Sequence, residues 1–262
     1  MGRFDDYKFR CSSLGKIVSK SGKLTDTTKT YLNELFIQEV YGVRKEVRTK
    51  YFEKGVFEEE SGITLLNQTL HPGKLLLKNK ERKSNEYIHG EADCIVDGIV
   101  YDIKNAWDLF TFAKAGLSHD YYWQLVGYMM LWELDKARLF YCLNNTPDHI
   151  LIDEEKRLFW NNQHIYTTME SPDYLRACTE LRILHNYDSM PVEERFKVWD
   201  VPFSLDSWIE IKASVRQARG CLNELDAERN SHLQRNRDVM RGCNSVTILH
   251  TPIDEGKIVE VV

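Results

Sequence analysis

The sequence predicts an α+β or mixed α/β fold, in which helices come first and surround a sheet centred on one hairpin. Apolar residues recur at helical spacing over 31–40 and are followed by Gly42, a residue that commonly ends helices. Asp97-Gly98 separates two apolar runs and fits the two-residue turn of a β-hairpin. An apolar stripe over about 205–239 predicts a long helix near the end of the chain, packed on its own domain.

The other elements follow from the same patterns. A helix is expected over about 56–67, where three glutamates precede an apolar run, and a largely buried helix over 119–134, where apolar side chains cover most of the circumference. Alternating and continuous apolar runs predict the strands. These are expected at 86–96, 99–105, 137–143, 149–153, 156–160 and 196–201.

Composition excludes several classes of protein. With 262 residues, of which 42% are hydrophobic and 29% charged, the chain can bury a core, unlike a disordered chain, a collagen-like repeat or a coiled-coil rod. The longest apolar stretch, 125–134, is about half a membrane span and contains Glu133, so no membrane segment is expected. The first residues lack an apolar signal core, and the six cysteines form no C-x-x-C pair. We therefore expect a cytoplasmic protein with free thiols, no zinc and no iron–sulfur cluster.

Positive charge is concentrated early in the chain, although the net charge is −5. Residues 1–54 hold 12 Lys/Arg and 7 Asp/Glu, which leaves 23 and 33 for the rest. A second basic cluster occupies 78–83. Such a distribution suits a protein that contacts phosphates with one surface and cations with another, and it is also compatible with solvated surface loops.

The hairpin predicts a pair of carboxylates. If Asp97-Gly98 forms the turn, Asp93 lies opposite Asp102, and Lys104 points to the same face. Opposed like charges destabilise a sheet, so a cation is needed between them. Lys104 and a divalent metal are the two candidates, and an ordinary surface pair is the alternative without chemistry. Hard oxygen ligands favour Mg²⁺ or Mn²⁺ over Zn²⁺.

Three motifs carry a resemblance to a known family. Gly90-x-x-Asp93, Asp102-x-Lys104 and Gln124-x-x-x-Tyr128 resemble the PD-(D/E)XK nuclease superfamily, and more narrowly its YqaJ/lambda-exonuclease-like, RecB-nuclease-related branch. The resemblance spans roughly residues 10–145 and implies a restriction-endonuclease-like core, with a central mixed sheet flanked by helices. The chain departs from the common pattern in two places: Ala92 precedes the motif Asp where Pro is common, and Asp102 replaces Glu.

The resemblance also implies the site residues and their roles. A catalytic acid is expected on the preceding helix shortly after Gly55; Glu59 has the expected offset, and Glu58 and Glu60 remain open. The implied metal ligands are Glu59, Asp93, Asp102 and the Ile103 carbonyl, with Lys104 assisting the attacking water and Gln124 and Tyr128 organising the back of the site. The implied ion is Mg²⁺, which Mn²⁺ can replace.

DNA, in particular a duplex end, is the expected partner. Near the start of the chain Arg10, Ser12, Ser13 and Lys16 resemble the segment that binds a terminal 5′-phosphate in the lambda-exonuclease branch. Backbone phosphates are expected to contact the second basic cluster through Lys78, Lys80, Arg82 and Lys83. The resemblance further implies a homo-oligomer, to which the 205–239 helix can contribute, and a single-strand annealing protein as a partner.

We therefore expect a Mg²⁺-dependent DNA exonuclease of recombination or DNA end processing, in a bacterial or phage-infected cytosol. A structure- or sequence-specific endonuclease on the same scaffold and a catalytically silent protein that binds DNA or a recombinase are the alternatives. The nuclease core with its basic N-terminal region is expected over 1–160, and a C-terminal extension packed on the core over 161–262.

Overall fold

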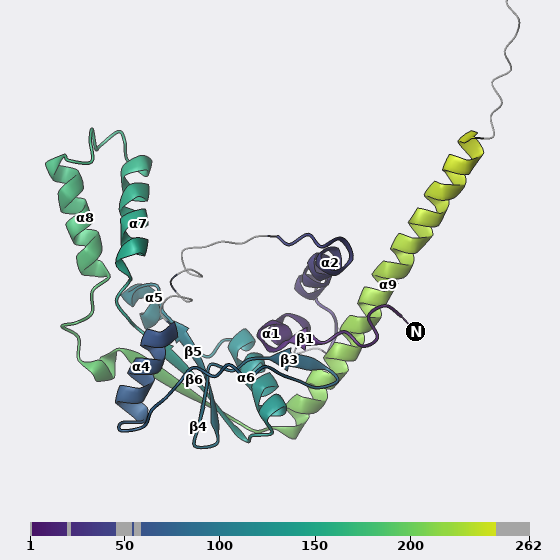
Figure 1. Ribbon diagram of the computed structural model, residues 1–262, viewed down its shortest axis with the longest axis horizontal. Coiled ribbons are helices and arrows are strands. Elements are labelled where there is room, and N and C mark those ends of the chain that lie inside the picture. The colour runs from purple at the N-terminus through teal and green to yellow at the C-terminus, as the bar shows by residue number, and fades with distance from the viewer. Residues whose placement is uncertain (1, 20–21, 46–53, 55–58, 245–262) are drawn as a thin grey trace, which may run out of the picture.

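The computed structural model describes residues 2–19, 22–45, 54 and 59–244, with side chains described as far as residue 241 (Figure 1). The elements within these residues are β1 (Phe9–Arg10), η1 (Cys11–Ser13), α1 (Leu14–Ile17), α2 (Asp26–Tyr41), α4 (Glu59–Leu70), β2 (Lys83–Ser84), β3 (Ile88–Gly90), β4 (Cys94–Val96), β5 (Ile99–Asn105), α5 (Leu109–Ala113), α6 (His119–Trp132), β6 (Lys136–Cys142), α7 (Asp148–Asn161), α8 (Pro172–Leu184), η2 (Val192–Glu194), β7 (Phe196–Pro202) and α9 (Leu205–Asn244).

The larger sheet has the strand order β4-β5-β6-β7. β5 and β6 are parallel, whereas the β4–β5 and β6–β7 pairs are antiparallel. Parallel neighbours need a crossover connection, and α5 with α6 supplies it between β5 and β6. The expected α+β fold with a central mixed sheet is confirmed, and the strands expected at 99–105, 137–143 and 196–201 are present.

The expected single strand over 86–96 is wrong, because the chain divides there between two sheets. β3 belongs to a small sheet of order β1-β3-β2, while β4 belongs to the larger sheet. Between them, the Asp93 side chain accepts the Ile103 N–H at 2.6 Å. The antiparallel ladder therefore ends at the Cys94–Tyr101 pair, and a side chain replaces the main chain as the next acceptor.

The predicted hairpin turn is confirmed. Asp97 and Gly98 both have positive φ, 54° and 73°, as a type I′ turn requires. The pairs Val96–Ile99, Ile95–Val100 and Cys94–Tyr101 are those that this turn predicts. The register fixes which β5 side chains face each side of the sheet.

Helices cover both faces of the larger sheet (Figure 1). α6 packs on one face, where Val100 and Leu139 meet Leu125 and Met129 in the main core. α4 packs on the other face, where Tyr101 and Ile103 meet a smaller core cluster. Because side chains alternate along β5, Asp102 points to the α6 face. Burial on both faces also explains why β5 begins with the apolar run Ile99–Tyr101.

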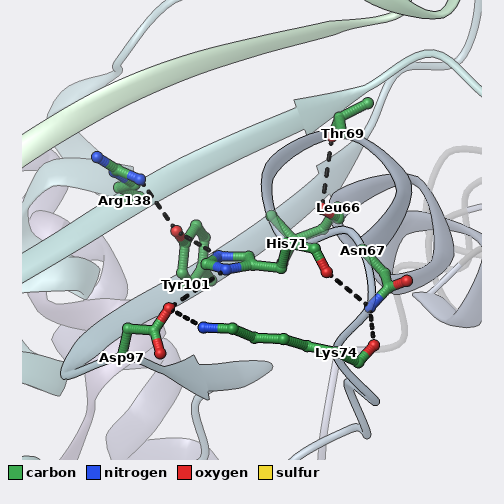
Figure 2. A network of polar contacts seen from close by, with 8 residues as sticks. All are labelled: Leu66, Asn67, Thr69, His71, Lys74, Asp97, Tyr101 and Arg138. Atoms are coloured by element: carbon green, nitrogen blue, oxygen red, sulfur yellow. Dashed lines mark hydrogen bonds and ion pairs between the residues drawn. The ribbon is translucent and has the colours of Figure 1, made fainter.

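A polar network on the α4 face anchors the hairpin turn (Figure 2). His71 follows α4, is 8% exposed and forms a 2.9 Å hydrogen bond with the Tyr101 hydroxyl. Arg138 donates to the same hydroxyl at 3.1 Å. Asp97 lies 3.5 Å from His71 Nδ1 and also pairs with Lys74. The network ties the end of α4 to the hairpin that carries Asp93 and Asp102.

The strands expected at 149–153 and 156–160 are wrong, because both segments belong to α7. Short apolar runs fit a strand or one face of a helix equally well, and only Ile150 and Leu151 of α7 are buried. Ion pairs three residues apart, Asp153–Lys156 and Glu154–Arg157, cover the solvent side. α7 and α8 lie side by side as an arm beyond the sheet (Figure 1).

α9 packs on its own chain through its first half, as the apolar stripe predicts. Ile211, Val215, Ala218 and Leu222 are fully buried against α1, α2 and α6. The second half extends away from the rest of the chain (Figure 1). In the described part of the chain, none of the helices combines the length and apolarity that a membrane crossing requires.

Candidate active site

Two carboxylates come together beside the hairpin. Asp102 lies within β5 and is 0% exposed. Asp93 lies just before β4, is partly buried, and accepts the main-chain N–H of Ile103, the residue that follows Asp102. The hairpin therefore brings together the two acids that the sequence placed opposite each other, although they do not form a pair of the β-ladder.

Each carboxylate oxygen of Asp102 has one polar neighbour. Gln124 Nε2 donates to Asp102 Oδ1 at 2.8 Å. Lys104 Nζ forms an ion pair with Asp102 Oδ2 at 2.6 Å. The Lys104 side chain remains 26% exposed, and its ammonium also lies 5.5 Å from the centre of the Tyr121 ring. A buried carboxylate needs such positive or donor groups around it, and an ionised carboxylate is also a ligand for a hard cation.

Burial and mutual repulsion raise the pKa of both acids. The pKa of Asp93 is raised to about 7, mainly by burial and secondly by the charge of Asp102. The charge of Lys104 and the hydrogen bond from the Ile103 N–H lower it in part. Burial also raises the pKa of Asp102 against the effect of Lys104. Such shifts mean that the folded protein disfavours two ionised carboxylates here unless a further positive charge is present.

The Gln-x-x-x-Tyr motif closes the site from α6. Gln124 Nε2 donates to the Tyr128 hydroxyl at 2.9 Å as well as to Asp102, so one buried amide links the two motifs. Gly90 allows this approach: a Cβ at Gly90 would lie 2.9 Å from Tyr128 Cε1 and 2.8 Å from Cys11 Sγ. Close packing against Cys11 and Tyr128 therefore explains why the Gly-x-x-Asp motif has a glycine at this position.

The third acid approaches from α4. Glu59 is the first residue of α4, and its charge contributes to the raised pKa of Asp93. α4 lies close to β5 because it has a glycine at the contact; a Cβ at Gly62 would be 2.6 Å from Ile103 Cγ2. Of the two alternatives, Glu60 is exposed and Glu58 lies outside the described residues.

Comparisons with known proteins gave solved structures but no family model and no curated protein. A phage-related exonuclease from Haemophilus somnus 129PT is 28% identical, covers 85% of this chain and 96% of its own, and superposes with a TM-score of 0.67. The alkaline exonuclease LHK-Exo from Laribacter hongkongensis is 13% identical over 90% of this chain and 96% of its own, with a TM-score of 0.55. The structure of LHK-Exo in complex with dAMP is 14% identical, covers 89% of this chain and 94% of its own, and has a TM-score of 0.55.

The resemblance to the lambda-exonuclease branch of the PD-(D/E)XK superfamily is confirmed. The Laribacter structures, at 13–14% identity, support the fold alone. The Haemophilus structure, at 28% identity, supports the resemblance as well. Within this PD-(D/E)XK fold the three motifs form one continuous contact set: Asp93 bonds to β5, Lys104 pairs with Asp102, and Gln124 connects Asp102 to Tyr128.

The donor set fits a hard cation that has few protein ligands. Among the residues that the structure describes, no three His, Cys, Asp or Glu side chains form a group that could hold a metal, and Glu59 is instead paired with Lys78. Mg²⁺ is usually held by one or two carboxylates together with water and substrate phosphates. Asp93 and Asp102 supply that number of carboxylates side by side at the hairpin.

The expected phosphate-binding residues near the start of the chain lie around one cavity. Arg10, Ser13 and Lys16 line a cavity of about 580 Å³ between β1, α1 and α2. Ser12 is exposed and is not among the residues that line it. Tyr31 of α2 closes the cavity next to Lys16, whose ammonium lies 5.0 Å from the centre of the Tyr31 ring.

The two basic segments of the sequence meet at His89. Arg10 pairs with His89 across the small sheet, and Arg82 approaches His89 Nδ1 at 3.4 Å. Burial and the charges of Arg82, Arg10 and Lys8 lower the pKa of His89. We call Lys8, Arg10, Arg82 and His89 the basic patch.

The other members of the 78–83 cluster have different surroundings. Lys80 is exposed. Lys83 lies 3.9 Å from Glu81 and 5.5 Å from the centre of the Trp132 ring. Lys78 contacts Glu59 at 2.6 Å and is therefore part of the carboxylate site.

Three residues at the carboxylate site were not assigned to it from the sequence, which predicted Lys78 as a phosphate contact and gave Tyr121 and Cys11 no role. Tyr121 lies three residues before Gln124 on α6, so helical spacing from Gln124 could have indicated it. No sequence signal indicated the packing of Cys11 against Gly90 or the contact of Lys78 with Glu59. Both join segments that are distant in the chain.

Proposed function

We propose that the chain is a Mg²⁺-dependent DNA exonuclease that hydrolyses phosphodiester bonds in phage or bacterial recombination or in DNA end processing. The observation that carries the proposal is the buried pair Asp93 and Asp102, with Lys104 and Gln124 on it, in a fold shared with a phage-related exonuclease. A carboxylate pair with raised pKa values is costly for folding, and such cost is typical of a functional site.

We assign the roles that the resemblance implies, and the contacts of Asp93, Asp102 and Lys104 support them. Asp93 and Asp102 would hold the cation together with the Ile103 carbonyl, and Glu59 would add a carboxylate from α4. Bound there, Mg²⁺ would act as a Lewis acid on the phosphate and lower the pKa of a water molecule. Lys104, partly exposed beside Asp102, orients the attacking water and neutralises charge that develops on the phosphate. Gln124 fixes Asp102 and Tyr128 in their relative positions.

DNA would lie across the basic patch. Arg10 and Arg82 come from segments more than seventy residues apart and meet at the same histidine, His89, which directly precedes the Gly90-x-x-Asp93 motif. The cavity lined by Arg10, Ser13 and Lys16 offers two cations and a hydroxyl to a terminal 5′-phosphate. Ser12, Lys80 and Lys83 would contribute contacts to the phosphates of the DNA backbone.

The remaining assignments also belong to this proposal. The nuclease core spans 1–160 and the extension 161–262, although β7 of the extension completes the larger sheet. By resemblance, the protein forms a homo-oligomer, works with a single-strand annealing protein and acts in the cytosol of a bacterium or an infected host.

The test uses purified protein with linear duplex, 5′-end-labelled duplex and covalently closed circular DNA, each with Mg²⁺ and with EDTA. We expect loss of the linear DNA in Mg²⁺ alone and an intact circle. Lys104→Ala should abolish cleavage while DNA binding survives, because Lys104 lies at Asp102 and not in the basic patch. Lys156→Ala, which removes an exposed lysine on α7, is the matched control and should cleave normally.

Other outcomes would contradict the proposal in different ways. Cutting of the closed circle would identify an endonuclease. DNA binding without cleavage in Mg²⁺ or Mn²⁺ would identify a silent DNA-binding protein. Equal activity of Lys104→Ala and the unaltered protein would remove Lys104 from the mechanism.

A further inference from the structure

The carboxylate site contains a second lysine that comes from a different segment of the chain. Lys78 Nζ lies 2.6 Å from Glu59 Oε2, and the two side chains are 38% and 26% exposed. Glu59 is the acid that α4 delivers to the site. In this structure its charge is therefore paired with an ammonium group of the protein.

Lys78 is held in this position by its neighbour in the sequence. The main-chain N–H of Asn79 donates to the Asp93 carbonyl at 2.9 Å, and Asn79 Nδ2 donates to the Ala92 carbonyl at 2.9 Å. The chain at 78–79 therefore runs alongside the Gly-x-x-Asp motif. The hydrogen bond with Glu59 is the main cause of the raised pKa of Lys78, and the charges of Glu59, Asp93 and Glu91 add to it.

The two lysines of the site differ in their freedom to move. Lys104 is part of β5 and packs between Asp102 and the Tyr121 ring. Lys78 lies within the loop between α4 and β2, where Leu75 and Leu77 are 84% and 69% exposed, and its ammonium is on a flexible four-carbon stem. Lys78 can therefore leave Glu59 without disturbing a strand, whereas Lys104 cannot move so easily.

We propose that Lys78 is a positioning residue that sets the affinity of the site for its divalent cation, because its ammonium occupies Glu59 until the cation displaces it. This inference rests on the proposed function. Glu59, Asp93 and Asp102 carry three negative charges when ionised, and Lys78 and Lys104 carry two positive charges, so the site has a net charge of about −1. Loss of Lys78 makes the site more negative and leaves Glu59 without its internal cation.

The experiment measures Mn²⁺ binding to the full chain by titration calorimetry without DNA, in the unaltered protein, Lys78→Met and Lys78→Arg. We expect Lys78→Met to bind Mn²⁺ at least about tenfold more tightly, since a unit charge within about 4–6 Å shifts such equilibria by 1–3 log units. Lys78→Arg keeps the charge and should bind within about threefold of the unaltered protein. The matched control is Lys156→Met, which removes a lysine from an exposed carboxylate pair on α7 and should leave the affinity unchanged.

Each outcome decides something. If the unaltered protein binds Mn²⁺ and Lys78→Met binds it equally or more weakly, the role of Lys78 is refuted while the proposed function stands. If Lys156→Met tightens binding as much as Lys78→Met, the effect is one of net charge and the inference also fails. If the unaltered protein does not bind Mn²⁺ at all, the proposed metal site and the inference fail together. Circular dichroism of each variant verifies that the fold is retained.

Discussion

Replacing Asp93 by asparagine should stabilise the metal-free protein at alkaline pH while abolishing cleavage. Asparagine has the same shape and keeps an oxygen that can accept the Ile103 N–H, which now bonds to Asp93 Oδ2 at 2.6 Å. What it removes is the negative charge. Burial and the charge of Asp102 raise the pKa of Asp93 from its ordinary value of 3.8 to about 7.

The sign follows from proton linkage. Between about pH 4 and pH 7 the folded protein keeps a proton on Asp93 that the unfolded chain has already lost, so stability falls as the pH rises through this window. A shift of about three pKa units at about 1.4 kcal/mol per unit gives an upper limit of about 4 kcal/mol. The side chain is only partly buried, and water lowers this cost. We therefore expect Asp93→Asn to exceed the unaltered protein by about 2–4 kcal/mol at pH 8 and by little at pH 4.

Urea unfolding in EDTA at pH 4, 6 and 8 measures this difference. Asp173→Asn is the control, because Asp173 has a 71% exposed side chain on α8 and its loss should leave the pH dependence unchanged. If Asp93→Asn and the unaltered protein lose stability in parallel between pH 4 and pH 8, the carboxylate pair is not strained. The inference from burial to a cation site would then be wrong.

Three further predictions concern the surroundings of this pair. Gln124→Leu should lower the free energy of unfolding by about 2–4 kcal/mol in urea titrations, because buried acceptors on Asp102 and Tyr128 lose their donor; unchanged stability would refute the bridge. Burial lowers the pKa of His71, so its neutral form stabilises the fold above about pH 6.5, and this contribution is lost as the pH falls through the lower folded pKa. Melting temperatures of His71→Asn should accordingly depend less on pH between 5 and 6.5 than those of the unaltered protein, and equal slopes would refute this. Alanine at Arg10 and at Arg82 should each weaken duplex binding regardless of sequence and reduce the slope of log K against log salt by about 1, whereas an unchanged slope would remove the residue from the DNA surface.

The parts of the fold that the sequence predicted correctly depend on local chemistry. Asp97-Gly98 needs two positive φ values, which these residues tolerate, and the turn then fixes the register of the whole hairpin. The 3.6-residue period of α6 and of the first half of α9 gave their extent because both are packed along their length.

The errors occurred where tertiary contacts decide the outcome. α7 was predicted as two strands because each apolar run, taken alone, fits either period, and only its position beside α8 selects the helix. The division of 86–96 into β3 and β4 depends on Asp93, whose side chain takes an N–H that a regular ladder would give to the main chain. The strand propensities of residues 91–93 do not indicate that a side chain will accept this main-chain N–H.

The same distinction applies to the candidate site. Asp93, Asp102 and Lys104 lie within twelve residues of each other on one hairpin, so register alone could bring them together. Lys78, Tyr121 and Cys11 reach the site from other elements, and their positions depend on packing at glycines and on main-chain hydrogen bonds.

The pair Asp93 and Asp102 is electrostatically unfavourable, because burial and their mutual repulsion raise both pKa values. β5 begins with apolar residues and then places Asp102, which is 0% exposed, beside a second acid. A core selected for stability alone would carry an apolar residue at this position, because a buried ion pair seldom repays its desolvation. Gln124 and Lys104 offset part of the cost at Asp102, and the Ile103 N–H offsets part of it at Asp93. This cost supports the proposal that a bound cation completes the site, and the stability of Asp93→Asn, the Mn²⁺ affinity of Lys78→Met and cleavage by Lys104→Ala test that proposal by independent measurements.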